Sequence, residues 1–301
     1  MIYRNTRTTC LSLSAVCPWV SHDTLGRLLQ AGLSWSGRLW TAVACQLVQA
    51  GGCLVLDDTS WQRWTEKAEA VSFVWCGRWS RVIKGMQVVL LIWTDGHWKI
   101  PLGVRLWRQG GPSKITLALE LIEAAAQANV TPTHVLFDSW YAAAGLLNRL
   151  DELGWRYVAQ LKSNRKVDGQ PIRHRWAHRF GHTDGHLTRV HHWVRVIKDG
   201  RRFWVTNDLT LTPAQIKHHY RRRQQIEETF RLLKQEFGWG SCRARKADAQ
   251  IVHLHLGLVA LCLTQQSAFN QGLTIYAFKR QLFRLPIPDH LPWLQPFLDA
   301  A

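Results

Sequence analysis

The chain has 301 residues, of which 47% are hydrophobic and 20% are charged. That much apolar material excludes a disordered chain and is enough for a sizeable core. Lysine and arginine number 38 against 21 aspartates and glutamates, so the formal net charge is +17 with histidine neutral. Because such an excess of positive charge repels itself, it indicates a polyanionic partner, with nucleic acid first and an anionic membrane surface second.

Cysteine usage and apolar runs bear on the compartment. None of the seven cysteines belongs to a Cys-x-x-Cys pair, so neither a zinc knuckle nor a disulfide framework is indicated. The apolar runs at 88–93 and 254–263 are too short, or too interrupted by polar residues, for the roughly 20 residues that cross a bilayer. The stretch 10–20 lacks the continuous apolar centre of a signal peptide. We therefore expect a cytoplasmic protein with no membrane partner.

Residues 1–50 are predicted to be a segment of short helices. Ser21, His22 and Asp23 offer N-cap candidates before an amphipathic run that contains Leu25 and Leu28. Both DNA binding and plain structural packing are compatible with this segment.

Short apolar stretches after Gly51 predict strands separated by helices. The expected strands are 54–56, 82–93, 100–107, 134–137, 156–161 and 202–206, and helices are expected at 115–126 and 142–153. Two of these strands end on acids: Asp57 and Asp58 follow the first, and Asp138 follows the fourth. The pattern predicts an α/β layer structure, in which ligand sites lie at strand ends.

The rest of the chain contains a region rich in polar residues and then two long helical patterns. Residues 163–206 are rich in histidine, arginine and glycine with alternating apolar positions, which predicts an inserted β region. One long helix is expected from Pro213 to about Phe237, and a second over 247–266. We therefore divide the chain into a helical segment at 1–50, a catalytic core at 51–265 and a helical C-terminal appendage at 266–301.

The first of these two helices carries an ordered set of polar residues. At about 100° per residue, four side chains separated by three, four and seven positions fall within roughly 60° of arc; they are Tyr220, Arg223, Glu227 and Lys234. An adjoining apolar stripe includes Ile226 and Phe230. Without further context the polar set is also compatible with a solvated row of salt bridges.

The spacing Y-x2-R-x3-E-x6-K resembles the signature of a group of bacterial insertion-sequence DDE transposases, named YREK after these residues. The surrounding text "HHYRRRQQIEETFRLLKQEFG" is similar to that family's helix, as are "LVLDDTS", "VLFDSWY" and "WRYVAQLKSNR" elsewhere. The resemblance extends from about residue 20 to residue 265.

The resemblance implies a ribonuclease-H-like core in which two aspartates and a glutamate bind two divalent ions, Mg²⁺ or Mn²⁺. The chemistry of the residues agrees, because hard carboxylate oxygens suit these ions and phosphodiester cleavage commonly uses a metal pair. The expected metal ligands and catalytic residues are Asp57, Asp138 and Glu227. Asp58 is the alternative first acid, since adjacent strand residues face opposite sides and only one of the two can face the metals.

By the same resemblance, Tyr220, Arg223 and Lys234 are expected to contact DNA phosphates. A basic face extends this set through Arg222, Arg243, Arg245 and Lys246. Trp140 and Tyr141 follow the second acid, and both base stacking and closure of the core are compatible with them.

The resemblance implies a bacterial transposase that cleaves the terminal inverted repeats of its element and joins the 3′ ends to target DNA. Double-stranded DNA is the expected partner, with a homodimer on the DNA and a location at the nucleoid. Two alternatives stay open: a catalytically inactive DNA-binding descendant, and a basic nuclease without strand transfer.

Overall fold

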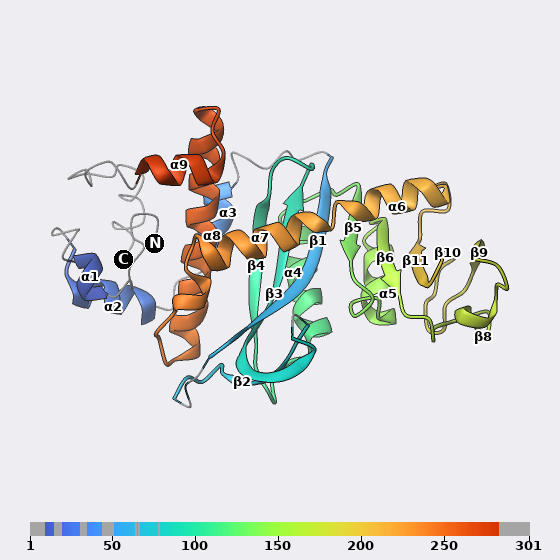
Figure 1. The fold of residues 1–301 in the computed structure, drawn as a ribbon, viewed down its shortest axis with the longest axis horizontal. Helices are drawn as coiled ribbons and strands as arrows, with labels where there is room; N and C mark the ends of the chain where they lie inside the picture. The colour runs from blue at the N-terminus through green and yellow to red at the C-terminus, as the bar shows by residue number, and fades with distance from the viewer. Residues whose placement is uncertain are drawn as a thin grey trace.

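The computed structural model describes residues 10–14, 20–30, 35–43, 51–63, 65, 67–77 and 79–282. A mixed α/β architecture is built on a nine-stranded, mainly antiparallel sheet with helices on both faces (Figure 1). Its strands run in the order β2-β3-β1-β5-β6-β11-β10-β9, and β4 pairs with β3. The α/β class expected from the sequence agrees with this arrangement.

The central sheet contains every strand expected from an apolar run, together with β2 and further strands in the expected insertion. Its strands are β1 Cys53–Gln62, β2 Ser72–Cys76, β3 Arg81–Thr94, β4 Ile100–Trp107, β5 His134–Phe137, β6 Tyr157–Leu161, β9 Phe180–Gly185, β10 Val194–Asp199 and β11 Arg202–Thr206. β1 pairs with β5, and β5 with β6, in parallel; β3 is antiparallel to β1, β2 and β4. A small second sheet pairs β7 (Lys166–Val167) with β8 (Gln170–Pro171).

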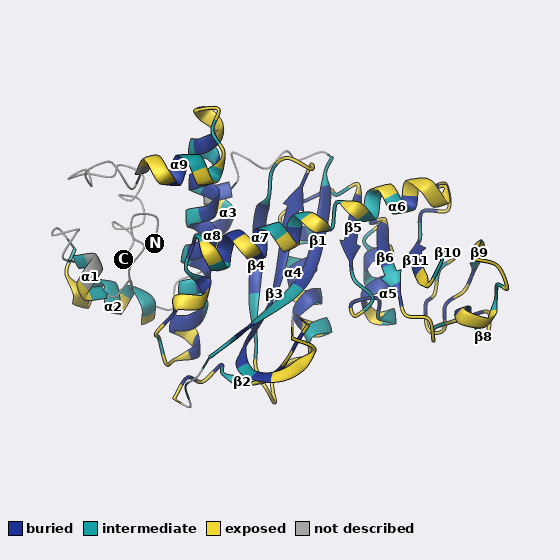
Figure 2. Ribbon diagram, viewed as in Figure 1, coloured by how far each residue is buried: buried dark blue, intermediate teal, exposed yellow. Residues whose placement is uncertain are grey.

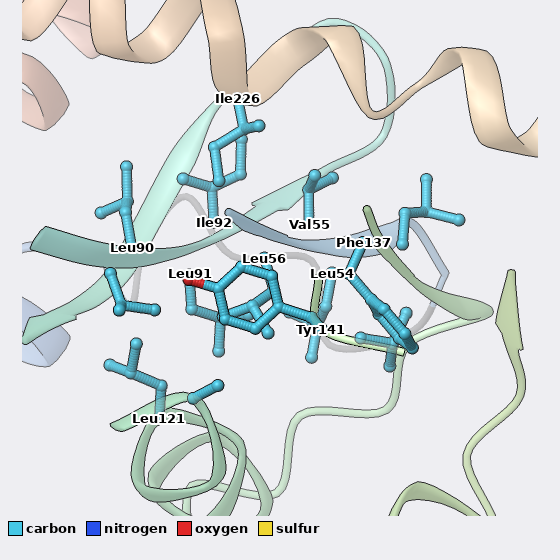
Figure 3. Close-up of a cluster of buried hydrophobic side chains, with 14 of the residues drawn as sticks. Leu54, Val55, Leu56, Leu90, Leu91, Ile92, Leu121, Phe137, Tyr141 and Ile226 are labelled. Atoms are coloured by element: carbon cyan, nitrogen blue, oxygen red, sulfur yellow. The ribbon is translucent and has the colours of Figure 1, made fainter. Parts of the chain in front are cut away.

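Helices cover the two faces of the central strands. On one face lies α7 (Gln224–Gln235), whose Ile226 points toward the sheet; on the other lies α4 (Lys114–Gln127), with Leu121 (Figure 3). Both side chains are buried, and each buried aliphatic side chain of this size contributes roughly 1.5–3 kcal/mol. The interior of the sheet is almost wholly buried, and exposed residues gather on outer helix faces and loops (Figure 2).

The helix expected over 213–237 is two helices. α6 (Pro213–Arg221) begins at a capping box formed by Thr212 and Gln215, and α7 begins at Gln224. Between them, the backbone N–H groups of Arg222 and Arg223 donate to carbonyls three residues back, so the chain tightens into a 3₁₀-type turn. The periodicity could not reveal this break, because the helical spacing of Tyr220, Arg223 and Glu227 continues across it.

The helix expected over 247–266 is longer than predicted. α8 spans Ala247–Asn270, so the expected domain boundary at residue 265 falls inside it. By length and composition, α8 is the one helix in the described ranges able to cross a membrane, but 67% of its apolar window is buried within the protein. Gly257 lies against the Trp239 ring, where a Cβ would stand only 2.7 Å from it. Such burial is typical of a core helix.

The remaining helices flank the core. α1 (Cys10–Ser14), α2 (His22–Gln30) and α3 (Trp35–Val43) lie in the expected N-terminal segment, and both α2 and α3 pack against α8. α5 (Ala144–Glu152) follows β5, and α9 (Ile275–Leu282) follows α8. Within the expected insertion at 163–206, β9, β10 and β11 extend the central sheet beyond β6. The last part of the expected appendage, 283–301, lies outside the described residues.

Candidate active site

Two of the predicted acids, Asp57 and Asp138, lie at the same level of neighbouring parallel strands. The sequence predicted that the first strand ends before Asp57, but β1 continues through Asp57 and Asp58 to Gln62, and only Asp138 follows its strand. In the register between β1 and β5, Leu56 is paired with Phe137, so Asp57 and Asp138 are the next residue on each strand. Asp57 is itself still paired, with Leu90 of β3. The Asp138 carboxylate accepts hydrogen bonds at Oδ1 from the backbone N–H groups of Trp140 and Tyr141, which fixes the turn after β5.

Asp57 and Asp58 face opposite sides of the sheet, as strand alternation requires. Asp57 points toward α7, where its Oδ2 lies 3.2 Å from Nη1 of Arg223. Asp58 points toward α4, where its Oδ1 lies 2.9 Å from Nζ of Lys114. Only Asp57 therefore lies on the side that carries the third predicted acid.

The Asp58 carboxylate accepts hydrogen bonds from three side chains. Besides Lys114, it accepts hydrogen bonds from the Gln87 amide at 2.6 Å and from the Tyr141 hydroxyl at 2.8 Å. Tyr141 is fully buried, so closure of the core is its role here. Nothing near Lys114 or Gln87 in the sequence marks them as partners of Asp58, since the contacts arise only when α4 packs on β1 and β3.

The third predicted acid, Glu227, meets Asp57 through a shared arginine. Nη1 of Arg223 lies 2.8 Å from Oε1 of Glu227 as well as 3.2 Å from Oδ2 of Asp57. Burial lowers the pKa of the Arg223 guanidinium, but the charges of Asp57, Tyr220, Glu227 and, least, Asp138 raise it above its ordinary value. Carboxylates from β1 and α7 thus pair with one cation, and the charge of Asp138 after β5 acts on the same group.

Burial and like charge both act on Asp57. The residue is only 8% exposed, and burial is the main cause that raises its pKa from 3.8 to about 7. The Arg223 charge acts in the opposite direction, while the charges of Asp138 and Asp58 raise the pKa further. The positive charge of Arg223 alone is therefore not enough to hold the pKa of Asp57 at its ordinary value.

The donor set suits a hard divalent cation. Asp57, Asp138 and Glu227 offer only carboxylate oxygens, and a cation bound to Asp57 would oppose both the burial and the like charges that raise its pKa. As the side chains stand, no three acidic, imidazole or thiol groups within the described ranges are gathered closely enough to share an ion. Arg223 pairs with two of the three acids instead, so it has to withdraw before these acids can share a metal.

The other signature residues point toward the sheet. The Tyr220 hydroxyl donates to Oε1 of Gln160 on β6, and burial raises its pKa to about 12. Lys234 donates to the Thr59 hydroxyl and the Ser60 carbonyl of β1. Tyr220, Arg223 and Lys234 therefore contact strands directly, whereas Glu227, whose side chain is 55% exposed, contacts Arg223.

The additional basic residues lie in two places. Arg222 turns inward, with Nη1 lying 3.7 Å from the Cys53 sulfur. Arg243, Arg245 and Lys246 are exposed on the segment before α8. Trp140 is 53% exposed beside Asp138, and the ammonium groups of Lys114 and Lys162 lie 4.5 and 4.6 Å from its ring centroid.

Comparison with known proteins places this geometry in a family. Residues 50–263 match the family model described as a transposase DDE domain. A curated relative, the probable transposase for insertion sequence element IS701 from Microchaete diplosiphon, is 24% identical over 225 residues. The match covers 63% of this chain and 59% of that relative, so it spans less than two thirds of the relative's length.

A solved structure shares the fold. The cryo-EM structure of the piggyBac transposase synaptic complex with hairpin DNA superimposes with a TM-score of 0.54 at 11% identity. The superposition covers 99% of this chain and 72% of the piggyBac chain. The fold is thus similar to a transposase fold, and the family model covers well over half of the sequence. This chain belongs to the transposase DDE domain family.

Proposed function

We propose that this protein is the transposase of a bacterial insertion sequence of the YREK group, acting on DNA in the cytoplasm at the nucleoid. It cleaves the terminal inverted repeats of its element and transfers the 3′ ends to target DNA. The family match and the relative from an insertion sequence support the class of activity. The observation that carries the proposal is that Asp57 and Glu227 share Arg223 while the charge of Asp138 acts on both Asp57 and Arg223.

We assign residues 51–265 to a ribonuclease-H-like core. Support comes from the mixed sheet, in which Asp57 on β1 and Asp138 directly after β5 lie at the same level of adjacent parallel strands. The third acid lies on α7, which packs against β1. This layout brings together residues that are far apart in the chain without any contribution from the helical segment before β1.

Asp57, Asp138 and Glu227 would hold two Mg²⁺ or Mn²⁺ ions. When bound, such ions lower the pKa of an attacking water or hydroxyl and stabilise the leaving oxygen. The protein residues supply the geometry: the two aspartates are fixed by paired strands, and Glu227 is fixed by the packing of α7. Asp58, already satisfied by Lys114, Gln87 and Tyr141, keeps a structural role in this proposal.

Arg223 changes partner in the proposed reaction. In the described structure it neutralises Asp57 and Glu227. Once these acids bind cations, its guanidinium becomes available to a DNA phosphate, to which it can donate two parallel hydrogen bonds. Tyr220 and Lys234 flank it on the same helical face and are proposed to bind neighbouring phosphates. We also propose a homodimer on double-stranded DNA, as the family resemblance implies.

A cleavage assay tests this function directly. Purified protein is incubated with Mg²⁺ and duplex DNA from the ends of the flanking element, and cleaved and joined products are resolved. Glu227→Gln should lower cleavage more than about 100-fold, beyond the loss usual for a residue that only supports a ligand. DNA binding should persist, because the basic face is unchanged.

Glu228→Gln is the matched control, since Glu228 lies next to Glu227 on α7 and pairs with Lys99 at 3.3 Å. It should retain cleavage. If the wild-type protein binds element ends but yields no metal-dependent product, it is an inactive DNA-binding descendant. Cleavage without joined product would instead indicate a nuclease, and full cleavage by Glu227→Gln would remove Glu227 from the site.

A further inference from the structure

An arginine-lined cavity of about 320 Å³ lies beyond the catalytic acids, where β1 ends. Its wall includes Arg63, Arg243 and Arg245 together with Gln62 and Thr65, and none of the described residues lining it is acidic. We call the three arginines and the space between them the arginine cavity. Three guanidinium groups around one hollow form a site that suits an anion.

Arg63 shows that the positive charge is not compensated within the cavity. Its backbone N–H donates to the Lys84 carbonyl at 3.0 Å, and Nη1 donates to the Gly240 carbonyl at 3.4 Å. Its Nε is buried and has no hydrogen-bond partner among the described residues. Burial lowers the pKa of Arg63, and the like charge of Arg243 lowers it further. A buried donor without a partner is costly, so an oxyanion held here would be favourable.

A hairpin with exposed aromatic residues adjoins the cavity. Phe73 and Trp75 on β2 are 69% and 58% exposed, and Val82 on β3, paired with Trp75, is 58% exposed. We call these three residues the hairpin surface; its exposed tip is visible in Figure 2. At the tip, the guanidinium of Arg81 lies 5.6 Å from the Trp79 ring centroid. Aromatic side chains beside cations are typical of nucleic-acid contacts.

Charge and position both favour DNA as the occupant. The sequence from residue 70 to 94 contains no acidic residue, so the hairpin would repel a second copy of itself. Along β3, Val82 has the same parity as Leu90, which pairs with Asp57. Because side chains alternate along a strand, the hairpin surface and the first catalytic acid therefore lie on the same face of the sheet.

We propose that the arginine cavity binds a backbone phosphate of the DNA, and that the hairpin surface packs against the sugars and bases beside it. The proposal rests on the proposed transposase function and adds a second DNA-holding site to it. Asp57 and Gln62 are five residues apart on β1, or about 17 Å at roughly 3.3 Å per residue. At about 3.4 Å per nucleotide, the phosphate lies about five base pairs from the cleaved bond.

Salt-dependent DNA binding tests the cavity. A labelled 40-base-pair duplex from the element end is titrated with full-length protein in EDTA at several KCl concentrations. The double variant Arg243→Gln/Arg245→Gln should lower the slope of log affinity against log salt by about 0.9, the value for one lost phosphate contact. The matched double variant Arg108→Gln/Arg280→Gln, which removes two exposed arginines elsewhere, should leave the slope unchanged.

Placement is tested with single methylphosphonate substitutions in the same duplex. Neutralising the phosphate about five base pairs from the cut should weaken wild-type binding but not binding by Arg243→Gln/Arg245→Gln. Phe73→Ser/Trp75→Ser should weaken binding about fivefold, equivalent to roughly 1 kcal/mol, with little change in salt slope. Both of its residues are exposed, so its melting temperature should match the wild type.

The outcomes separate this inference from the proposed function. If the wild type binds and cleaves while Arg243→Gln/Arg245→Gln keeps the full salt slope, the cavity holds no phosphate and only this inference fails. If the wild type neither binds nor cleaves element ends, the proposed function fails as well. If Phe73→Ser/Trp75→Ser dissociates an oligomer in light scattering but leaves DNA affinity intact, the hairpin surface is a protein contact and the inference is overturned.

Discussion

Asp57 and Asp58 are consecutive residues of β1, yet their carboxylates lie in different electrostatic surroundings. Asp58 has a nearby ammonium group and two neutral donors. Asp57 is buried beside Asp138, and only Arg223 opposes the rise of its pKa to about 7. Asp58 therefore has three hydrogen-bond partners, whereas the burial of Asp57 is offset only in part by Arg223.

This difference predicts opposite effects of two neighbouring substitutions on stability. Below pH 4 the Asp57 carboxyl is neutral in both the folded and the unfolded chain. Between pH 4 and 7 the unfolded chain releases this proton while the folded chain retains it, so the free energy of unfolding falls as the pH rises. Asp57→Asn removes this loss, and at pH 8 without metal it should raise the free energy of unfolding by about 1 kcal/mol or more.

Asp58→Asn should act in the other direction. It leaves the Lys114 ammonium, whose side chain is 17% exposed, without its carboxylate partner. We expect a loss of about 1–3 kcal/mol at pH 8. Urea unfolding in EDTA at pH 5 and pH 8 measures both variants, and changes of the same sign in the two would contradict the assignment of the two carboxylates to opposite faces.

The sequence could narrow the first acid to these two residues but not choose between them on physical grounds. Both follow the same apolar run, and strand alternation says only that they face opposite sides. Which side carries the site depends on where α7 and α4 pack, and that is settled by contacts between residues more than 50 positions apart. Asp138 had no such competitor in the sequence, and for Glu227 the spacing of the signature excluded the neighbouring Glu228.

At the scale of elements, the break between α6 and α7 places Arg223 at a tightened turn. Arg223 is the residue before α7, and its N–H donates to the Tyr220 carbonyl three residues back. In such a turn, side chains three residues apart lie on the same side. Tyr220 and Arg223 thus stay together next to the acids, with the guanidinium 6.0 Å from the phenol ring centroid.

Arg223→Ala tests whether this turn also serves DNA. If Arg223 binds one phosphate, the substitution should reduce the salt slope of DNA binding by about one unit. Fluorescence anisotropy at several KCl concentrations measures the slope, with Arg231→Ala, an exposed arginine of α7, as the control. A slope equal to that of the wild type would mean that Arg223 only neutralises Asp57 and Glu227.

Strands and helices with one buried face were predictable, and elements without one were not. The run 100–107 predicts β4 with its observed bounds, because apolar residues dominate it. β2 was missed, since its alternation exposes Phe73 and Trp75 and buries Val74, the reverse of what side-chain size alone suggests. The arginine cavity was missed for another reason: Arg63 joins Arg243 and Arg245 only through the fold.

At the scale of the whole molecule, the sheet collects acids that are distant in sequence. Asp57 and Asp138 are 81 residues apart, and Asp138 and Glu227 are 89 residues apart. These acids repel one another, but they belong to a chain of net charge +17. Many lysine and arginine side chains of the same protein can therefore bind DNA phosphates. Divalent cations and DNA would then neutralise opposite charges on neighbouring surfaces, which predicts that each strengthens binding of the other.

Because the three acids come together only in the folded chain, a divalent ion bound by them should stabilise the whole fold. A ligand at 100 times its dissociation constant adds about 2.7 kcal/mol to the free energy of unfolding. Mn²⁺ should therefore raise the melting temperature, and more at pH 8 than at pH 6, because Asp57, with its pKa near 7, must ionise to bind the ion. Differential scanning fluorimetry measures this shift. Asp57→Asn and Glu227→Gln should lose most of the shift and Glu228→Gln should keep it, whereas an equal shift in all three variants would mean that the ion binds elsewhere.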